Sequence, residues 1–161
     1  MLILAIDTST PTLVTGLVRD GVTVAERILP KCREQEERLV PCVQECLAEV
    51  DATFQDVTAI VVGCGPGPFT GLRVGMATAA AFGDALGVPV HGVCSLDAIA
   101  ARIDAPKVLV TTDARRREVY WAWYQDGRRV GGPGVQSPSE SFPQAHMVNV
   151  PEHLADKLSI E

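Results

Sequence analysis

The sequence predicts a two-lobed α/β protein, and three observations on its 161 residues support this. Apolar runs typical of buried strands alternate with stretches of helical spacing, as in α/β folds. Two of the strand runs end near an acid, at Asp7 and at Asp113. Each acid stands thirteen residues before an Asp-Gly turn, so the two segments coincide when the sequence is shifted by 106 residues. This recurrence indicates a structural duplication.

The composition fits one core, or two small lobes of one domain, but not two independent domains. The chain is 47% hydrophobic and 21% charged, with a net charge of −6. An acidic chain repels phosphate backbones, so direct binding to nucleic acid would need a local basic patch. We expect neither a signal peptide nor a membrane span. The five scattered cysteines include no C-x-x-C pair, which favours a reduced, cytoplasmic protein.

The first lobe, expected over residues 1–106, opens with a buried strand and a hairpin. The strand "LILAID" is tipped by Asp7, and Asp20-Gly21 forms a two-residue turn between "TLVTGLV" and "VTVAERIL". A helix is predicted over residues 34–50 because its apolar residues recur at helical spacing: Leu39, Val43, Cys46, Leu47 and Val50.

A strand, a helix, a strand and a helix complete the first lobe. The strand "VTAIVVGCG" runs into a Gly/Pro-rich loop, and Thr70 is placed to cap the helix of residues 70–86. The strand "VPVHGVC" follows, and Ser95 is placed to cap a short helix. The second lobe, over residues 107–161, repeats the strand and hairpin. It continues with a Pro/Gly/Ser-rich loop at about 131–144, so we expect a curtailed version of the first lobe.

The strand tip at Asp7 has the residue types of a phosphate and magnesium site. Its carboxylate would hold a hydrated metal ion, and the hydroxyls of Thr8 and Ser9 would meet phosphate oxygens. However, the turn has no glycine for close backbone approach, and these side chains can instead hydrogen-bond their own turn. The later loop "GCGPGPFTG" has two prolines without N–H donors and no G-K-[ST]. A kinase or ATPase that uses Mg-ATP in an Asp7/Asp113 cleft is therefore the alternative function.

Small residues recur every four positions along the helix of residues 70–86 and at its end: Gly71, Gly75, Ala79, Gly83 and Gly87. Each interior glycine costs a helix about 0.5–1 kcal/mol relative to alanine, so close packing must offset the penalty. The stripe would meet either the chain's own sheet or another subunit. In the second case it forms part of a partner interface with the preceding helix, made of Leu39, Val43, Leu47, Gly71, Gly75, Ala79 and Gly83.

A second candidate contact is basic, and no catalytic cluster is evident. Arg115, Arg116 and Arg117 are a local exception in an acidic chain and would meet RNA phosphate, an acidic partner face or only solvent. The three histidines show neither H-x-x-x-H nor H-E-x-x-H spacing, and no nucleophile has an evident base. We therefore predict no catalytic residue and no metal ligand, and a metallopeptidase is poorly supported.

Four segments closely resemble the TsaB family, also called YeaZ and formerly labelled glycoprotease-like. They are "ILAIDTST", "ERLVP", the block from "VVGCGPGPFTG" to "VCSLDAIA", and "DARRREVYWAWY", within residues 1–127. Cys64 and Pro68 resemble the actinobacterial branch of the family. The resemblance implies an actin/Hsp70/hexokinase-like ATPase (ribonuclease H-like) fold with two lobes, the second curtailed. It also makes Asp7, Thr8, Ser9 and Asp113 a vestigial nucleotide cleft.

The resemblance also implies a function in forming threonylcarbamoyladenosine next to the anticodon of tRNA. The family is a non-catalytic paralogue of TsaD, the transferase of this modification, and pairs with TsaD or with itself through the helices at about 34–50 and 70–86. We therefore expect a scaffold or activator subunit rather than an enzyme. Its partners are TsaD and, through TsaD, TsaE.

The same resemblance sets the expected ligands. No cofactor is expected to bind tightly, with ATP and magnesium present only as part of the complex, and tRNA is reached only indirectly. A stand-alone tRNA-binding module is disfavoured by the net charge. Gln35 and Glu36 stand where the family often has a histidine, which removes a residual metal ligand.

Overall fold

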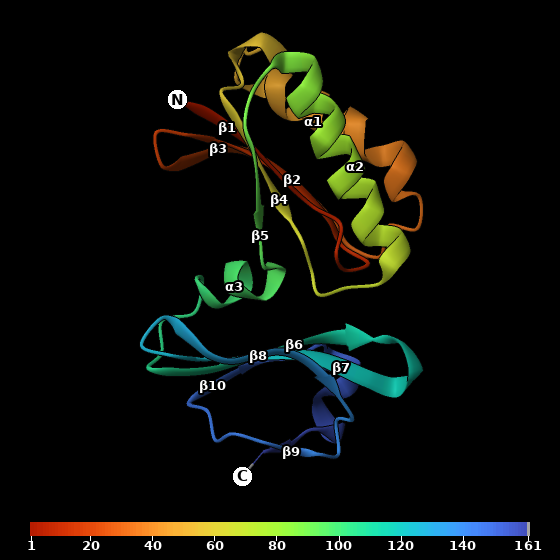
Figure 1. The fold of residues 1–161 in the computed structure, drawn as a ribbon, viewed down its shortest axis with the longest axis vertical. Coiled ribbons are helices and arrows are strands. Elements are labelled where there is room, and N and C mark those ends of the chain that lie inside the picture. The colour runs from red at the N-terminus through yellow and green to blue at the C-terminus, as the bar shows by residue number, and fades with distance from the viewer. Residues whose placement is uncertain (161) are drawn as a thin grey trace. The chain divides into compact units, whose positions relative to one another are not determined.

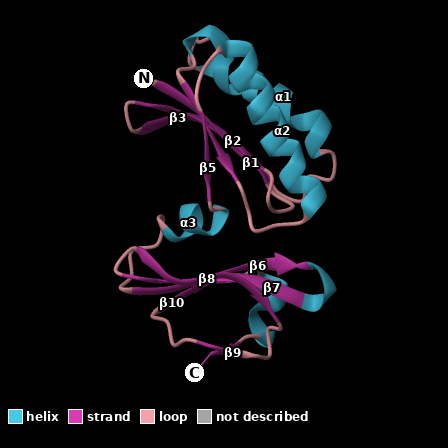
Figure 2. Cartoon of the chain, viewed as in Figure 1, coloured by secondary structure: helices cyan, strands magenta, loops and turns pink. Residues whose placement is uncertain are grey.

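The computed structural model describes residues 1–160, and the chain divides into two compact units. Unit 1 comprises residues 1–64 and 69–93, and unit 2 comprises residues 65–68 together with Cys94 and the residues after it. Each unit contains a sheet of its own with helices packed on it (Figure 2). No helix within residues 1–160 has the length and apolar character needed to cross a membrane.

Unit 1 is a five-stranded sheet with two helices on one face (Figure 1). Its elements are β1 Leu2–Asp7, β2 Leu13–Arg19, β3 Val22–Leu29, α1 Gln35–Glu49, a 3-10 turn Phe54–Asp56, β4 Ala59–Gly63, α2 Phe69–Leu86 and β5 Val90–Val93. The first three strands form an antiparallel meander, β4 pairs in parallel with β1, and β5 pairs in parallel with β4. The strand order is therefore β3-β2-β1-β4-β5.

The helices lie on this sheet because one side of β1 is apolar. Leu2, Leu4 and Ile6 alternate with less buried residues and are at most 5% exposed. Leu39 and Val43 of α1 belong to the same core. Burying a side chain of this kind stabilises the fold by about 1.5–3 kcal/mol. The helix predicted over residues 34–50 is confirmed to within one residue at each end.

Unit 2 is a four-stranded sheet with a short helix on one face. Its elements are α3 Ser95–Ala100, β6 Lys107–Ala114, a 3-10 turn Arg115–Arg117, β7 Glu118–Gln125, β8 Arg128–Gln136, β9 Ser141–Phe142, β10 Met147–Asn149, a 3-10 helix Glu152–Lys157 and β11 Ser159–Ile160. The strand order is β10-β6-β7-β8. Leu96 of α3 packs in one core with Val108 and Val110, while Phe142 and Leu154 belong to a second core with Leu109.

The two sheets share one topology, which confirms the duplication predicted from the sequence. The meander β1-β2-β3 corresponds to β6-β7-β8, and the parallel neighbour β4 of β1 corresponds to β10 beside β6. Both hairpins turn at an Asp-Gly pair with positive φ at both residues, as a two-residue turn of this kind requires. These pairs are Asp20-Gly21 and Asp126-Gly127.

Both predicted helix caps are wrong in position. Thr70 lies inside α2, which begins one residue earlier at Phe69. Ser95 is the first residue of α3, and Cys94 is the N-cap. The Ser95 hydroxyl instead accepts a hydrogen bond from the Gly65 amide at 3.1 Å, so it anchors the loop at residues 65–68 rather than its own helix.

The limits predicted for the second lobe also differ from the structure. Helix α3 packs against β6 and β7, so the unit begins at Cys94 rather than after residue 106. The loop predicted at 131–144 is a strand as far as Gln136, because β8 passes over the indole ring of Trp121. A Cβ on Gly134 would lie 2.7 Å from Trp121 Nε1, so only glycine lets the strand come this close.

Candidate functional site

The hydroxyl of Thr8 is inserted into helix α2. It donates a hydrogen bond to the Gly71 carbonyl at 2.6 Å and accepts one from the Gly75 amide at 2.9 Å. These two backbone groups are four residues apart, which is the pair that an α-helix ordinarily joins directly. Thr8 therefore ties the carboxyl end of β1 to the first turns of α2.

The close approach of Thr8 requires glycine at two positions of α2. A Cβ on Gly71 would lie 2.6 Å from the Thr8 carbonyl oxygen, and one on Gly75 would lie 2.5 Å from Thr8 Oγ1. Real side chains do not reach such distances. Further along the helix, a Cβ on Gly83 would overlap the side chain of Val90 on β5. Gly71, Gly75 and Gly83 therefore face the sheet of their own unit, whereas Gly87 lies just beyond α2 and is exposed.

The rest of the turn after β1 is also engaged in bonds within unit 1. The Ser9 amide donates to Asp7 Oδ1 at 2.7 Å, and the Thr10 carbonyl accepts from Gln35 Nε2 of α1 at 2.8 Å. Thr8 and Ser9 are each 2% exposed. Asp7, predicted to hold a hydrated metal ion, is partly open to solvent, whereas the two residues predicted to meet phosphate are buried. The turn is thus a joint between the sheet and both helices.

Asp113, the fourth residue of the predicted cleft, lies in unit 2 near the end of β6. Its Oδ2 is 3.4 Å from Nε2 of His153, and both side chains are well exposed. A cleft that joins Asp113 to Asp7 stays a prediction.

The residues predicted as the partner interface lie on the inner side of their helices, so the prediction chose the wrong face. Leu39, Val43 and Leu47 are at most 3% exposed and belong to the core of unit 1. Gly75, Ala79 and Gly83 are buried, and Gly71 is partly buried against Thr8. In this fold these seven residues pack the helices onto the sheet.

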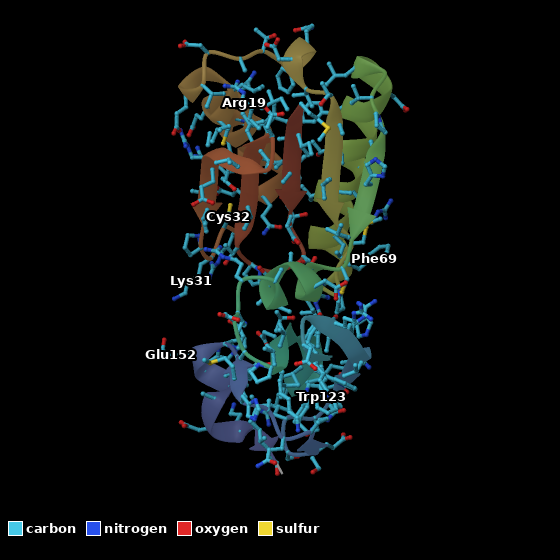
Figure 3. All side chains as sticks on the ribbon, turned by 90° about the vertical axis from the view of Figure 1, so that its left-hand side faces the viewer. Arg19, Lys31, Cys32, Phe69, Trp123 and Glu152 are labelled. Atoms are coloured by element: carbon cyan, nitrogen blue, oxygen red, sulfur yellow. The ribbon has the colours of Figure 1, made fainter. Side chains whose placement is uncertain are left out.

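The opposite side of α2 is apolar and carries mostly small side chains. We define the outer face of α2 as its exposed residues, which are Phe69, Thr70, Arg73, Met76, Ala77, Ala80, Ala81, Asp84 and Ala85. Phe69, at the start of the helix (Figure 3), is 71% exposed, and Met76 is 43% exposed. The Arg73 guanidinium stacks over the Phe69 ring at 5.1 Å. The sequence did not predict this face, because the regular glycine spacing indicated the opposite side of the helix as the packing surface.

The cysteines of α1 behave as small apolar side chains, as the sequence indicated. Cys42 and Cys46 have no exposed surface, and burial is the main cause that raises the pKa of each thiol. Among residues 1–160, no three His, Cys, Asp or Glu side chains converge as metal ligands would.

A hydrogen-bonded cluster beneath α3 lines a cavity of about 200 Å³ in unit 2. Asp97 Oδ1 accepts a hydrogen bond from the Tyr124 hydroxyl at 2.7 Å and one from Arg129 Nη1 at 3.1 Å. Burial and the bond to Asp97 together raise the pKa of Tyr124 far above its usual value. The other lining residues are mostly apolar, among them Ile103, Ala105 and Val108, so the cluster fastens α3 to the sheet.

Comparison with known sequences gives one family match and several relatives. Residues 22–153 match the family model described as "TsaD: tRNA N6-adenosine threonylcarbamoyltransferase". An uncharacterized protein of Mycobacterium leprae is 52% identical over 160 residues, which cover 96% of this chain and 44% of that protein. TsaB of Bacillus subtilis, called a tRNA threonylcarbamoyladenosine biosynthesis protein, is 39% identical over 127 residues, which cover 78% of this chain and 56% of that protein. The chain thus spans about half the length of these relatives.

Solved structures agree with these matches. YeaZ from Pseudomonas aeruginosa superposes with a TM-score of 0.79 at 28% identity, over 92% of this chain and 84% of that one. The ROK hexokinase of Thermus thermophilus superposes with a TM-score of 0.50 at 18% identity, over 82% of this chain and 49% of that one, and shows the fold alone. The hexokinase-like fold class expected from the sequence is confirmed.

The contact between Thr8 and α2 predicts a strong coupling between two substitutions. We expect Gly75→Ala to cost about 1–3 kcal/mol of unfolding free energy, because the new methyl group overlaps the Thr8 hydroxyl. In a Thr8→Ala background the same change should be neutral or stabilising by up to about 1 kcal/mol, because alanine favours the helix. Denaturant unfolding of the four proteins measures the cycle. If the changes in unfolding free energy of the two substitutions are additive, the contact between Thr8 and Gly75 is contradicted.

The bond between Tyr124 and Asp97 predicts a fall in stability at alkaline pH. An unfolded tyrosine loses its proton near its ordinary pKa of about 10, whereas the folded protein holds this proton to higher pH. The stability is therefore full below about pH 10 and falls above it. Unfolding at about pH 8 and about pH 11 should show this fall, and Tyr124→Phe should lessen it. An equal fall in both proteins would show that Tyr124 is not responsible.

Proposed function

The chain belongs to the TsaB/YeaZ family, and from that premise we propose that it acts as a non-catalytic subunit in the biosynthesis of threonylcarbamoyladenosine in tRNA. Its task is to pair with TsaD and support that transferase. TsaE associates through TsaD, and a second copy of this chain can occupy the same surface. ATP and magnesium take part only within the complex. The names of the TsaB relatives support the pathway.

The proposed pairing with TsaD rests mainly on the outer face of α2. Six of its nine residues are apolar, and four of these are alanines. Short side chains allow the backbone of a second helix to approach closely, and the larger Phe69 and Met76 supply apolar area. Charge is sparse, with only Arg73 and Asp84. We infer that this face, together with exposed Val40 of α1, receives a helix of TsaD.

The non-catalytic role is supported by how the turn after β1 is used. A phosphate would need the hydroxyl of Thr8 or the amide of Ser9, and each already bonds within unit 1. To meet a phosphate, Thr8 would have to give up its bonds to Gly71 and Gly75, which hold β1 against α2. An ATP-hydrolysing role through Asp7 and Asp113 therefore has less support than the pairing role.

A charge placed on the outer face of α2 should separate pairing from folding. We expect Ala80→Glu to weaken the affinity for TsaD at least about tenfold, since an unpaired charge in a packed apolar contact costs well over 1.4 kcal/mol. Thermal unfolding should change little, because Ala80 is exposed. Titration calorimetry of the chain into TsaD measures the effect.

The matched control is Ala98→Glu, the same change at an exposed position of helix α3 in unit 2. It should leave the affinity unchanged. If both variants bind TsaD as tightly as the unmodified chain, the outer face of α2 is not the interface.

The non-catalytic role makes a second prediction. The chain alone should not hydrolyse ATP in the presence of magnesium above the rate in buffer, and Asp7→Asn should change nothing. A coupled assay of ADP release over a range of protein concentrations measures this. Turnover that scales with the chain and disappears in Asp7→Asn would instead establish the alternative ATPase function.

A further inference from the structure

The turn between β6 and β7 presents three arginines whose side chains form no ion pair within residues 1–160. Arg115, Arg116 and Arg117 are all exposed, and no carboxylate lies within 4.0 Å of their guanidinium groups in that range. Asp113 at the end of β6 instead lies near His153. Three exposed guanidinium groups, each with about five N–H donors, therefore lie together in one turn.

The backbone of this turn is held in an uncommon conformation. Arg116 has φ 66° and ψ 26°, and Arg117 has φ 64°, so two successive residues with side chains are left-handed. The left-handed conformation costs an L-residue about 1–2 kcal/mol, and glycine or asparagine would adopt it at least as easily as arginine. Successive backbone N–H groups in a turn can form a concavity that binds anions, and the left-handed residues Arg116 and Arg117 suit such a turn.

The charge of the chain is distributed in keeping with this anion site. Unit 1 holds six basic and eleven acidic residues, whereas unit 2 holds eight basic and nine acidic ones. The arginine turn, residues 113–118, has three positive charges against two carboxylates, Asp113 and Glu118. It is a positive point on an otherwise acidic molecule, and phosphate is attracted to it rather than to the rest of the surface.

We propose that the arginine turn binds the phosphate backbone of RNA directly. Guanidinium groups bind phosphate and carboxylate alike, but backbone N–H groups in a concavity suit a compact phosphate better than a side chain of a protein partner. The identity of the RNA as tRNA rests on the proposed function. The inference goes beyond the expectation that tRNA is reached only through TsaD, because it gives this chain its own contact with the substrate.

The test measures binding of an unmodified tRNA, with adenosine next to its anticodon, to the chain alone by fluorescence anisotropy over a range of salt. The triple variant Arg115→Gln/Arg116→Gln/Arg117→Gln should bind about tenfold or more weakly at low salt. Because each neutralised phosphate contributes about 0.7–0.9 to the slope of log K against log salt, the slope should become shallower by about 2. Lys at all three positions should retain part of the affinity, because the charge remains but the fork geometry is lost.

The matched control neutralises three other exposed arginines, Arg33→Gln/Arg102→Gln/Arg128→Gln, and so changes the net charge equally. It should keep most of the affinity. Equal losses in the two triple variants would show only a dependence on net charge and overturn the proposal. Absence of measurable tRNA binding at low salt would overturn it as well, as would binding of ATP or inorganic phosphate to the turn without binding of tRNA.

Sedimentation of the same variants with TsaD separates this inference from the proposed function. We expect the arginine-turn variant to pair with TsaD normally. If it loses TsaD and keeps tRNA, the turn meets an acidic protein face and the RNA proposal is wrong. If the unmodified chain does not pair with TsaD at all, the proposed function fails, while the tRNA measurement still decides the inference by itself.

Discussion

The insertion of the Thr8 hydroxyl between Gly71 and Gly75 fixes how unit 1 is assembled. Glycines in a helix cost about 0.5–1 kcal/mol each, and here two hydrogen bonds of about 0.5–1.5 kcal/mol each, with tight backbone packing, offset that cost. The same turn is held from the other side by Gln35 of α1. One short segment after β1 therefore places both helices on the sheet.

This constraint also determines which surfaces are left for function. Because the polar groups of the turn are used inside unit 1, a ligand at the strand tip finds few free donors there. Because glycine faces inward, the alanine side of α2 faces outward with Phe69 and Met76 at its borders. A helix with small residues on both sides can pack closely against its own sheet and still accept a second helix. Unit 2 repeats the meander of unit 1, but the turn between its strands β6 and β7 consists of three arginines. This turn gives unit 2 a positively charged feature that the first meander lacks.

Much of the fold could be predicted from the sequence because it depends on local chemistry. The Asp-Gly turns need positive φ at both residues, and the apolar spacing of α1 is visible in its own segment. The direction of the glycine stripe could not be predicted, because periodicity shows that residues share one face but not which neighbour that face meets. Thr8 and Gly75 are 67 positions apart, and no local pattern joins them. The strand β8 was missed for a similar reason, since the contact of Gly134 with Trp121 is what makes its glycine-rich sequence compatible with a strand.

Hydrogen–deuterium exchange of the chain alone and mixed with TsaD tests most directly whether the partner binds on helix α2. Exchange should slow on mixing in the peptides that cover α2, Phe69–Leu86, and α1, Gln35–Glu49, while β7 and β8 of unit 2 stay unchanged. Slower exchange confined to β7 and β8, with α2 unaffected, would contradict the assignment and place the partner on unit 2.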